Sequence, residues 1–295
     1  MTAAGPHDEV LAGVRGGAFA LAYRMLGSVA EAEDVVQEAL LRLHAALEAG
    51  EEIRSPRAYA TTVTTRLAID QLRAARRRRE QYVGDWLPEP LLTDGGADDP
   101  ARAAELADSL SVAFLVLLEQ LSPAERAALL LRDVFDYGYA EIAGIIGCTE
   151  ANARQLASRA RRHVEARRPR FEASPEHRDE LAHRFFAAAR DGDMPALEAL
   201  LAEDVVLQGD GGGNAPALAR PLHGRRRVAR TLASWGRHGA RLGASLHPAE
   251  VNGQPGAVLR DPEGAVFGVI TVEIAGGEVV GVRSVVNPDK LAHLR

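Results

Sequence analysis

The chain has 295 residues, 46% of them apolar, and a formal net charge of −6. Its length exceeds that of one typical domain, so we expect two or three domains, and its acidic balance excludes indiscriminate nucleic-acid binding by the whole surface. Cys148 is the single cysteine, which excludes an intramolecular disulfide and a cysteine-rich zinc site, and no His or carboxylate spacing predicts a metal site.

Arginine is concentrated in two islands on this acidic chain. Residues 66–79 hold six Arg and one acid, and residues 152–170 hold seven Arg and one acid. The stretch between them, 80–105, is strongly acidic. Two basic islands predict two local surfaces for a polyanion.

The first part of the chain, residues 8–80, is predicted to be helical. One helix spans 30–47, with Asp34, Glu38 and Arg42 on a face beside its apolar positions. Ser55 and Pro56 form a start signal for the next helix, because proline is favoured at the first helical position. That helix places four side chains within an arc of about 60°: Arg66, Asp70, Arg73 and Arg77.

Residues 81–107 break the helical pattern and are predicted to be a linker. The stretch DGGADDP has the composition of a flexible tether. The preceding WLPEP contains Trp86, Leu87 and Pro88, an apolar group that a tether does not need. We therefore expect this segment to dock into another domain, with local packing against the helical domain as the alternative.

Residues 108–170 are predicted to contain a helix-turn-helix. Ser122 and Glu125 form a capping box around Pro123, and a tight turn follows at Gly147 and Cys148, where we expect the cysteine to be a small buried filler. Thr149 is a good N-cap for the second helix. That helix has an apolar face of Ala153, Leu156, Ala157, Ala160 and Val164 opposite a polar face of Arg154, Gln155, Ser158, Arg159 and Arg162. Such a polar face fits a recognition helix in the major groove of DNA, whereas an ordinary solvated helix is the alternative.

Residues 171–295 change character and predict an α+β domain. Two packed helices are expected over HRDELAHRFFAAARDGDMPALEALLAED and a third over GRRRVARTLASWGRHG. Alternating apolar and polar runs separated by Gly, Pro, Asp and Asn then predict an antiparallel meander. Asp210 follows the strand VVLQG, where a general base with His223, His238 or His247 is one option and a turn former is the favoured one. The glycines after Asp210 form no P-loop, since no Lys-Ser/Thr follows them.

The order of acidic helix, basic helix, linker and helix-turn-helix resembles the extracytoplasmic-function (ECF) sigma factors of bacterial RNA polymerase, group IV of the sigma-70 superfamily. AEDVVQEAL (32–40) is similar to the segment that grips the polymerase, with Asp34, Gln37 and Glu38 at the matching positions. PRAYATTVTTRLAIDQLR (56–73) resembles the segment that melts and reads the −10 element, with Tyr59 and Arg66 in place of the usual Trp and Asn. LSPAERAALLLRDVFDYGYAEIAGIIGCTEANARQLASRARRHV closely resembles the domain that reads the −35 element.

Three further motifs resemble a subfamily, often called ECF41, whose members carry a C-terminal SnoaL-like domain of the NTF2 type, a cone of curved antiparallel sheet and helices. They are YVGDWLPEP (82–90), DGGGN (210–214) and NPDKL (287–291). The second motif usually ends in Lys, and this chain has Asn214 there. The resemblance implies control in cis by the last domain.

The resemblance implies a fold of two all-α sigma domains followed by an α+β cone: 1–80 sigma region 2, 81–107 linker, 108–170 sigma region 4, 171–295 the SnoaL-like domain. It also implies three sets of site residues. Those for the −35 element are Arg154, Gln155, Ser158, Arg159 and Arg162, and those for the −10 element are Tyr59, Arg66, Asp70, Arg73, Arg76 and Arg77. The interdomain regulatory residues are Trp86, Leu87, Pro88, Asp210, Gly211, Gly212, Gly213, Asn287, Pro288, Asp289 and Lys290. We expect WLPEP to dock near the motifs at 210–214 and 287–291.

The implied function is promoter-specific initiation with core RNA polymerase and promoter DNA as partners, no cofactor and no enzymatic activity. Two alternatives stay open. A helix-turn-helix regulator with a small-molecule ligand in the cone would explain two domains but not the polymerase-gripping helix, and an enzyme with a DNA-binding appendage would need convergent titratable groups in the cone. No apolar stretch approaches the 18 residues of a membrane span, and the first residues lack a signal-peptide pattern, so we expect a soluble, cytoplasmic protein.

Overall fold

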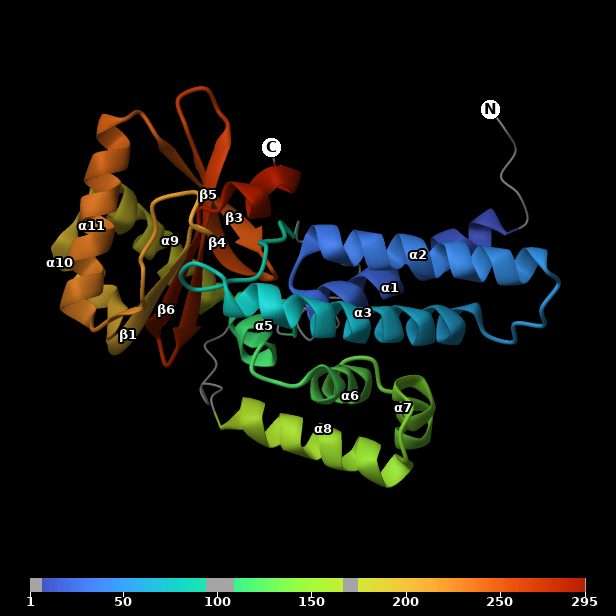
Figure 1. Ribbon diagram of the computed structural model, residues 1–295. Coiled ribbons are helices and arrows are strands. Elements are labelled where there is room, and N and C mark those ends of the chain that lie inside the picture. Colours follow the sequence, from blue (N-terminus) through green and yellow to red (C-terminus); the bar gives the residue numbers. More distant parts are fainter. Residues whose placement is uncertain (1–6, 94–108, 167–174, 295) are drawn as a thin grey trace. The chain divides into compact units, whose positions relative to one another are not determined.

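The computed structural model describes residues 7–93, 109–166 and 175–294 (Figure 1). Backbone contacts divide the chain into two units. Residues 1–80 and 115–167 form one unit, and residues 81–114 and 168–295 form the other. The segment that follows the first helical part therefore belongs with the last domain. The predicted domain boundaries stay predictions.

The first unit begins with three helices, α1 (Asp8–Leu26), α2 (Val29–Glu48) and α3 (Pro56–Glu80). Gly27 ends α1 in the left-handed conformation, and Ser28 caps α2 by accepting a hydrogen bond from the Glu31 amide. The apolar residues of α2 at helical spacing, such as Val35, Ala39 and Leu43, are buried. The side chains of residues 76–80 lie outside the described residues.

In the described residues, the helices that follow are α5 (Val112–Leu118), whose first residues belong to the second unit, α6 (Pro123–Asp133), α7 (Tyr139–Ile146) and α8 (Glu150–Glu165). The capping box of Ser122 and Glu125 is formed at the start of α6. Gly147 adopts a φ of 74° at the end of α7, a conformation that favours glycine, and so makes the tight turn into α8. Cys148 in this turn is half-buried rather than fully buried as expected, because its neighbours in the turn are exposed.

The second unit is built from three helices on a six-stranded sheet. The helices are α9 (Pro175–Asp191), α10 (Met194–Leu200) and α11 (Arg225–Arg241). The strands are β1 (Leu201–Asp210), β2 (Leu222–His223), β3 (Ser245–Val251), β4 (Gln254–Arg260), β5 (Val266–Ala275) and β6 (Glu278–Val285), followed by the 3-10 helix η1 (Pro288–Leu294). Phe185, Leu197 and Leu232 of the helices and Val205 and Val282 of the strands share one core.

The sheet has the strand order β2-β1-β6-β5-β4-β3 and is mixed. The meander from β3 to β6 is antiparallel as predicted. β1 pairs with β6 in parallel, which corrects the expectation of a wholly antiparallel sheet. The expected second helix also ends earlier, at Leu200, because LAED belongs to β1, where the alternate residues Val205 and Leu207 are buried. The pairing with β6 sets the end of β1, Asp210, opposite Val285, two residues before Asn287.

Candidate functional site

Helix α8 has the two faces that its sequence predicts. Its buried residues are Ala153, Leu156, Ala157, Ala160 and Val164. The five predicted DNA-contacting residues, Arg154, Gln155, Ser158, Arg159 and Arg162, are all exposed and line one open hollow with Ala151. Thr149 caps the helix by accepting a hydrogen bond from the Asn152 amide at 3.2 Å. An apolar back therefore anchors the helix, and its polar front is available to a ligand.

Two of the predicted DNA-contacting arginines of α8 are held by neighbouring groups. Arg154 pairs with Glu150 at 2.9 Å, one turn earlier, and its guanidinium lies 5.1 Å from the ring centroid of Tyr139. Arg159 lies 3.6 Å from Glu125 at the start of α6. These contacts orient the forks of exposed side chains, and such orientation suits binding to phosphate or to the edge of guanine.

The α2 face predicted to meet the polymerase is exposed. Asp34 and Gln37 are exposed, and Glu38 is half-buried and paired with Arg42 at 2.7 Å. Leu41, which sequence analysis did not single out, lies one turn further within the same arc of about 100° and is 55% exposed. Leu41 thus adds an apolar centre to a polar surface, the arrangement of an interface with an apolar core and a polar rim.

The predicted −10 residues of α3 have different surroundings. Asp70 and Arg73 form an exposed ion pair at 3.2 Å, and Tyr59 is half-buried. Arg66 reaches across to α7, where its Nε and Nη2 each donate a hydrogen bond of 2.9 Å, to the carbonyl oxygens of Ile145 and Gly144. The side chains of Arg76 and Arg77 lie outside the described residues.

Two further contacts join the three N-terminal helices to α6 and the turn after it. The Tyr137 hydroxyl donates a hydrogen bond to Thr61 Oγ1 at 3.0 Å. Arg126 of α6 is almost fully buried, where it donates to the carbonyl oxygen of Met25 and pairs with Glu119 at 2.7 Å. Burial lowers the pKa of the Arg126 guanidinium, so these oxygens offset a desolvation cost.

In the second unit, residues 82–93, called the docked segment below, lie against the end of β1, the β3–β4 turn and η1. Asp210 is fully buried at the centre of this contact. Its Oδ1 accepts hydrogen bonds from the Tyr82 hydroxyl at 2.6 Å and the Gly212 amide at 3.1 Å. Its Oδ2 accepts from the Leu87 amide at 2.8 Å. Two of these three bonds come from the docked segment, so one carboxylate holds both a side chain and a backbone amide of it.

Lys290 supplies the opposite charge. Its Nζ lies 2.7 Å from Asp210 Oδ2 and donates to the carbonyl oxygen of Leu87, whose amide Asp210 holds. The same ammonium lies 4.1 Å from the ring centroid of Trp86 and 5.0 Å from that of Tyr82. A buried ion pair with hydrogen bonds and two aromatic faces recovers much of the cost of removing both charges from water.

Close packing requires a glycine at position 212. A Cβ at Gly212, where φ is 60°, would lie 2.6 Å from Cγ of Asn287. Asn287 in turn donates a hydrogen bond to the Tyr82 hydroxyl at 2.9 Å. Asn214, where the resemblance expects Lys, donates to Asp289 at 3.0 Å. The motifs 82–90, 210–214 and 287–291 therefore meet, as the sequence predicted for the docking of WLPEP.

The far end of the docked segment is held by the turn between β3 and β4. Asn252 is fully buried at a φ of 55°. Its side-chain oxygen accepts a hydrogen bond from the Leu91 amide, and its backbone N–H donates to the Leu91 carbonyl. Leu92 forms a bridge with Val251, and Thr93 bonds Glu250 at 2.6 Å. His293 of η1 contacts the Pro90 carbonyl at 2.8 Å. The segment thus adds a short piece of strand to the edge of the sheet.

Burial also changes the titration of the docked segment. The pKa of Tyr82 is raised well above its ordinary value by burial and by its hydrogen bond to Asp210. The pKa of Asp85 is raised by burial, against a hydrogen bond from Gln208 that lowers it. The Tyr82 hydroxyl therefore stays a donor over the whole physiological range.

Three family models match the chain: Sigma-70 region 2 at residues 14–78, Sigma-70 region 4 at 111–164 and the SnoaL-like domain at 182–286. The ECF RNA polymerase sigma factor SigJ of Mycobacterium tuberculosis is 40% identical over 278 residues, which cover 92% of this chain and 88% of SigJ. The chain belongs to the ECF sigma factor family.

Two other comparisons agree with this assignment. The crystal structure of SigJ superimposes with a TM-score of 0.75 at 36% identity and covers 95% of this sigma factor and 96% of that chain. A probable ECF sigma factor of the same organism, SigI, is 34% identical over 93% of this chain and 91% of its own. The predicted fold class, two helical sigma domains followed by a SnoaL-like domain, is confirmed.

Sequence analysis missed three polar residues that hold the docked segment in this sigma factor. Tyr82 stands at the first position of the motif YVGDWLPEP, which was the available signal for it. Asn252 precedes Gly253, and Asn-Gly is a typical hairpin-turn pair, but this signal did not indicate a partner 161 residues away. His293 carried no signal. His223, His238 and His247, considered as partners of Asp210, are exposed and are not among its hydrogen-bond partners in the described residues.

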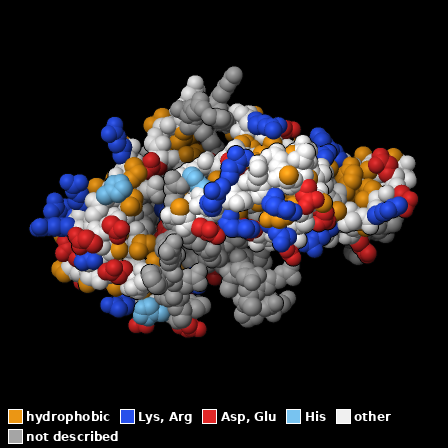
Figure 2. All heavy atoms as spheres, turned by 90° about the horizontal axis from the view of Figure 1, so that it is seen from below, with side chains coloured by type: hydrophobic (Ala, Val, Ile, Leu, Met, Phe, Trp, Pro, Cys, Tyr) orange, Lys and Arg blue, Asp and Glu red, His pale blue; other side chains and the backbone are white. Residues whose placement is uncertain are grey.

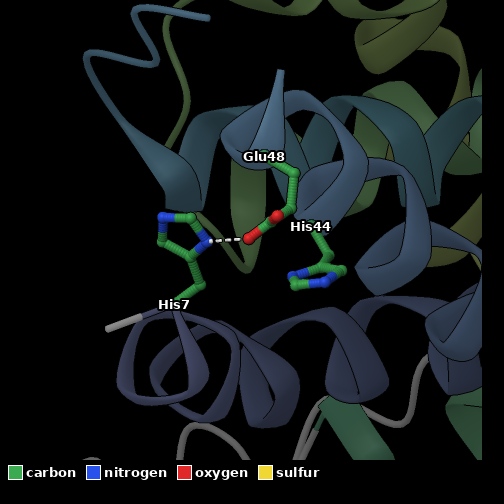
Figure 3. A group of neighbouring side chains, drawn as sticks. All are labelled: His7, His44 and Glu48. Atoms are coloured by element: carbon green, nitrogen blue, oxygen red, sulfur yellow. Dashed lines mark hydrogen bonds and ion pairs between the residues drawn. The ribbon is translucent and has the colours of Figure 1, made fainter. Parts of the chain in front are cut away.

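Among the described residues of this sigma factor, one group has the side-chain types of a metal site, which the spacing did not predict. His7, His44 and Glu48 bring one ligand atom each to within 4.8 Å of one another. Figure 3 shows His7 at the start of α1 facing Glu48 near the end of α2, with His44 one turn earlier. His7 Nδ1 lies 3.1 Å from Glu48 Oε1, a contact that ties the two helix ends together.

In the described chain, no helix is long and apolar enough to span a membrane.

Proposed function

We propose that this sigma factor binds core RNA polymerase through the exposed face of α2 and promoter DNA through α3 and α8, and that its SnoaL-like domain controls it in cis. Asp34, Gln37 and Leu41 would meet the polymerase. The polar face of α8 would contact the −35 element, and Tyr59, Arg66 and Arg73 the −10 element. The relatives whose names describe RNA polymerase sigma factors support these partners.

The grip of Asp210 and Lys290 on Leu87 is the observation that carries the proposed control. Leu87 lies in the stretch that connects region 2 to region 4, and the two buried charges hold its amide and its carbonyl. A connector fixed at this point limits the separations that the two sigma regions can adopt. Release of the docked segment would lift that limit and let the regions bind two promoter elements that lie apart on the DNA.

The contacts of Arg66 support a resting state in which the sigma regions are closed on each other. Its guanidinium is bonded to two carbonyls of α7, and the same group would be needed at the −10 element. Promoter binding therefore requires these bonds to break. Control of the connector and closure of the sigma regions would act on the same equilibrium.

A small-molecule ligand in the cone receives less support. Asp210, the polar group at the end of β1, is engaged by Tyr82, Leu87 and Lys290. A peptide segment of the same chain is thus the partner of the group that a ligand or a catalytic cycle would use. We propose no catalytic role for it.

Run-off transcription with purified core polymerase tests the proposal. The full chain is compared with Lys290→Met, which breaks the grip on Leu87, and with Arg184→Gln, an exposed change on the same domain. We expect core-dependent initiation with all three and a changed output for Lys290→Met only. No initiation by any version, with the polymerase active on a control factor, would favour a ligand-responsive DNA-binding regulator. Equal output from Lys290→Met and the full chain would refute control through the docked segment.

A further inference from the structure

Helix α11 of the SnoaL-like domain is the most basic helix for its length outside the two sigma regions. It carries six arginines and one histidine in 17 residues and no acidic residue. Its apolar residues Val228, Ala229, Leu232 and Ala233 are buried in the domain core. The domain core buries only the apolar face of α11, and five of the six arginines are exposed.

Four of these arginines form a line. At 100° per residue, Arg226, Arg230, Arg237 and Arg241 fall within an arc of about 60°, and all four are exposed. They are called the arginine stripe below. From the first to the last, the stripe extends about 22 Å along the helix axis at about 1.5 Å per residue. Figure 2 shows Lys and Arg side chains projecting from the part of the domain that carries α10 and α11, with acidic side chains beside them.

The stripe arginines differ from Arg225, which helps to hold α11 on the domain. Arg225 pairs with Glu278 at 3.1 Å and with Glu203 at 3.6 Å, and so ties α11 to the strands. Within the described residues, no ion pair links a stripe arginine to an acid. Arg237 donates to the Gly192 carbonyl and Arg241 to the Arg237 carbonyl, which orients them without neutralising them.

The placement of these charges works against the helix itself. Arg226 and Arg230, and likewise Arg237 and Arg241, are like charges one turn apart, which repel each other. Arg226 and Arg227 also occupy the first turn, where the helix dipole disfavours cations. Because no acid among the described residues pairs with the stripe to offset this repulsion, its placement indicates an external anionic partner.

We propose that the arginine stripe binds the phosphate backbone of duplex DNA. Arginine forks pair with phosphate oxygens in two-point contacts, and a line of four along about 22 Å presents them in a row as a DNA strand does. Contacts of this kind position a protein on DNA and carry no base sequence. The stripe would thus be a third DNA contact beside the two sigma regions, one that neither the family models nor the relatives' names assign.

Binding of the full chain to a duplex that lacks both promoter elements tests this site, with fluorescence anisotropy measured over a series of KCl concentrations. Arg226→Gln/Arg230→Gln removes half of the stripe. Arg184→Gln/Arg220→Gln removes the same charge from exposed positions elsewhere on the domain and is the matched control. Each phosphate contact contributes about 0.9 to the slope of log K against log salt, so the stripe variant should lose about 1.8 and the control much less.

Three outcomes decide between the partners. The proposal is supported if the slope falls in the stripe variant and not in the control. Circular dichroism checks that both variants are folded, and we expect the stripe variant to be folded because its change removes repulsion. Equal slopes in both variants would overturn it. Unchanged DNA binding with weaker assembly onto core polymerase would also overturn it, in favour of an acidic protein surface. Because the anisotropy assay contains no polymerase, and assembly onto core polymerase is measured separately, a failure in the anisotropy assay leaves the proposed promoter function standing.

Discussion

Arg66 of α3 caps the C-terminal end of α7 by donating hydrogen bonds to the carbonyl oxygens of Ile145 and Gly144, both at 2.9 Å. The last carbonyls of a helix have no partner within the helix and lie at the negative end of its dipole. A guanidinium is therefore well suited to them. Arg66 of region 2 therefore supplies hydrogen-bond donors to the end of a helix of region 4. The proposed function needs the same residue at the −10 element.

The closed arrangement of the sigma regions should loosen when Tyr137 is replaced by Phe. This change removes the hydrogen bond to Thr61 and leaves the charged face of α3 intact. A bond of this kind contributes about 1 kcal/mol, so the ratio of closed to open molecules should fall about fivefold. Energy transfer between dyes on Glu52→Cys and Glu165→Cys, in a Cys148→Ser background, measures the ratio. Tyr59→Phe is the control, and an equal change in both would contradict the assignment.

The buried pair of Asp210 and Lys290 should show strong coupling. Replacement of one partner leaves the other charge buried, at a cost of about 3–5 kcal/mol. We expect Lys290→Met and Asp210→Asn each to speed amide hydrogen exchange in residues 82–93. The double variant should be less perturbed than the sum of the two, because it leaves no lone charge. Additive effects would mean that the two groups hold the segment independently.

Docking of residues 82–93 should weaken at high pH through Tyr82. The docked phenol has a raised pKa, whereas the free segment ionises near the ordinary value of 10.0. The contribution of the phenol is therefore complete below pH 10 and is lost as the pH rises from 10 through the docked pKa. In the ultraviolet titration of the five tyrosines, Tyr82→Phe should remove a component that ionises late. Removal of a component at the ordinary pKa would show an undocked segment.

Gly212→Ala should be more harmful than Gly264→Ala. Both glycines have positive φ, 60° and 87°, so both changes carry backbone strain of about 1 kcal/mol or more. A Cβ at Gly212 would also collide with Asn287, whereas one at Gly264 meets nothing within 4 Å. The difference in thermal stability between the two variants isolates the contact with Asn287. Equal losses would mean that Asn287 moves aside at no cost.

Local patterns in the sequence predicted the elements well, and the contacts between distant elements less so. The faces of α8 follow from the periodicity of its 16 residues and from the cap at Thr149 just before them. The parallel pairing of β1 with β6 was missed, because strand alternation is the same for either direction. The meeting of residues 82–90 with Asp210 was predicted from the apolar WLPEP and the resemblance of three motifs. Tyr82 was missed because its motif gave a position but no partner, and Asn252 and His293 were missed because they lie outside the three motifs.

The docked segment also changes how the chain is connected. It begins at Tyr82, two residues after α3 ends at Glu80, so the last domain is connected to the chain just after region 2 as well as after region 4. The bond between Tyr82 and Asp210 closes a ring of chain that contains all of region 4. Because the entropy of ring closure grows only by about 0.6 kcal/mol for each doubling of length, insertions at 94–108 should be tolerated. A cut after residue 167 should leave the two pieces bound together, because Asp210 and Lys290 hold the docked segment by non-covalent contacts that the cut does not remove.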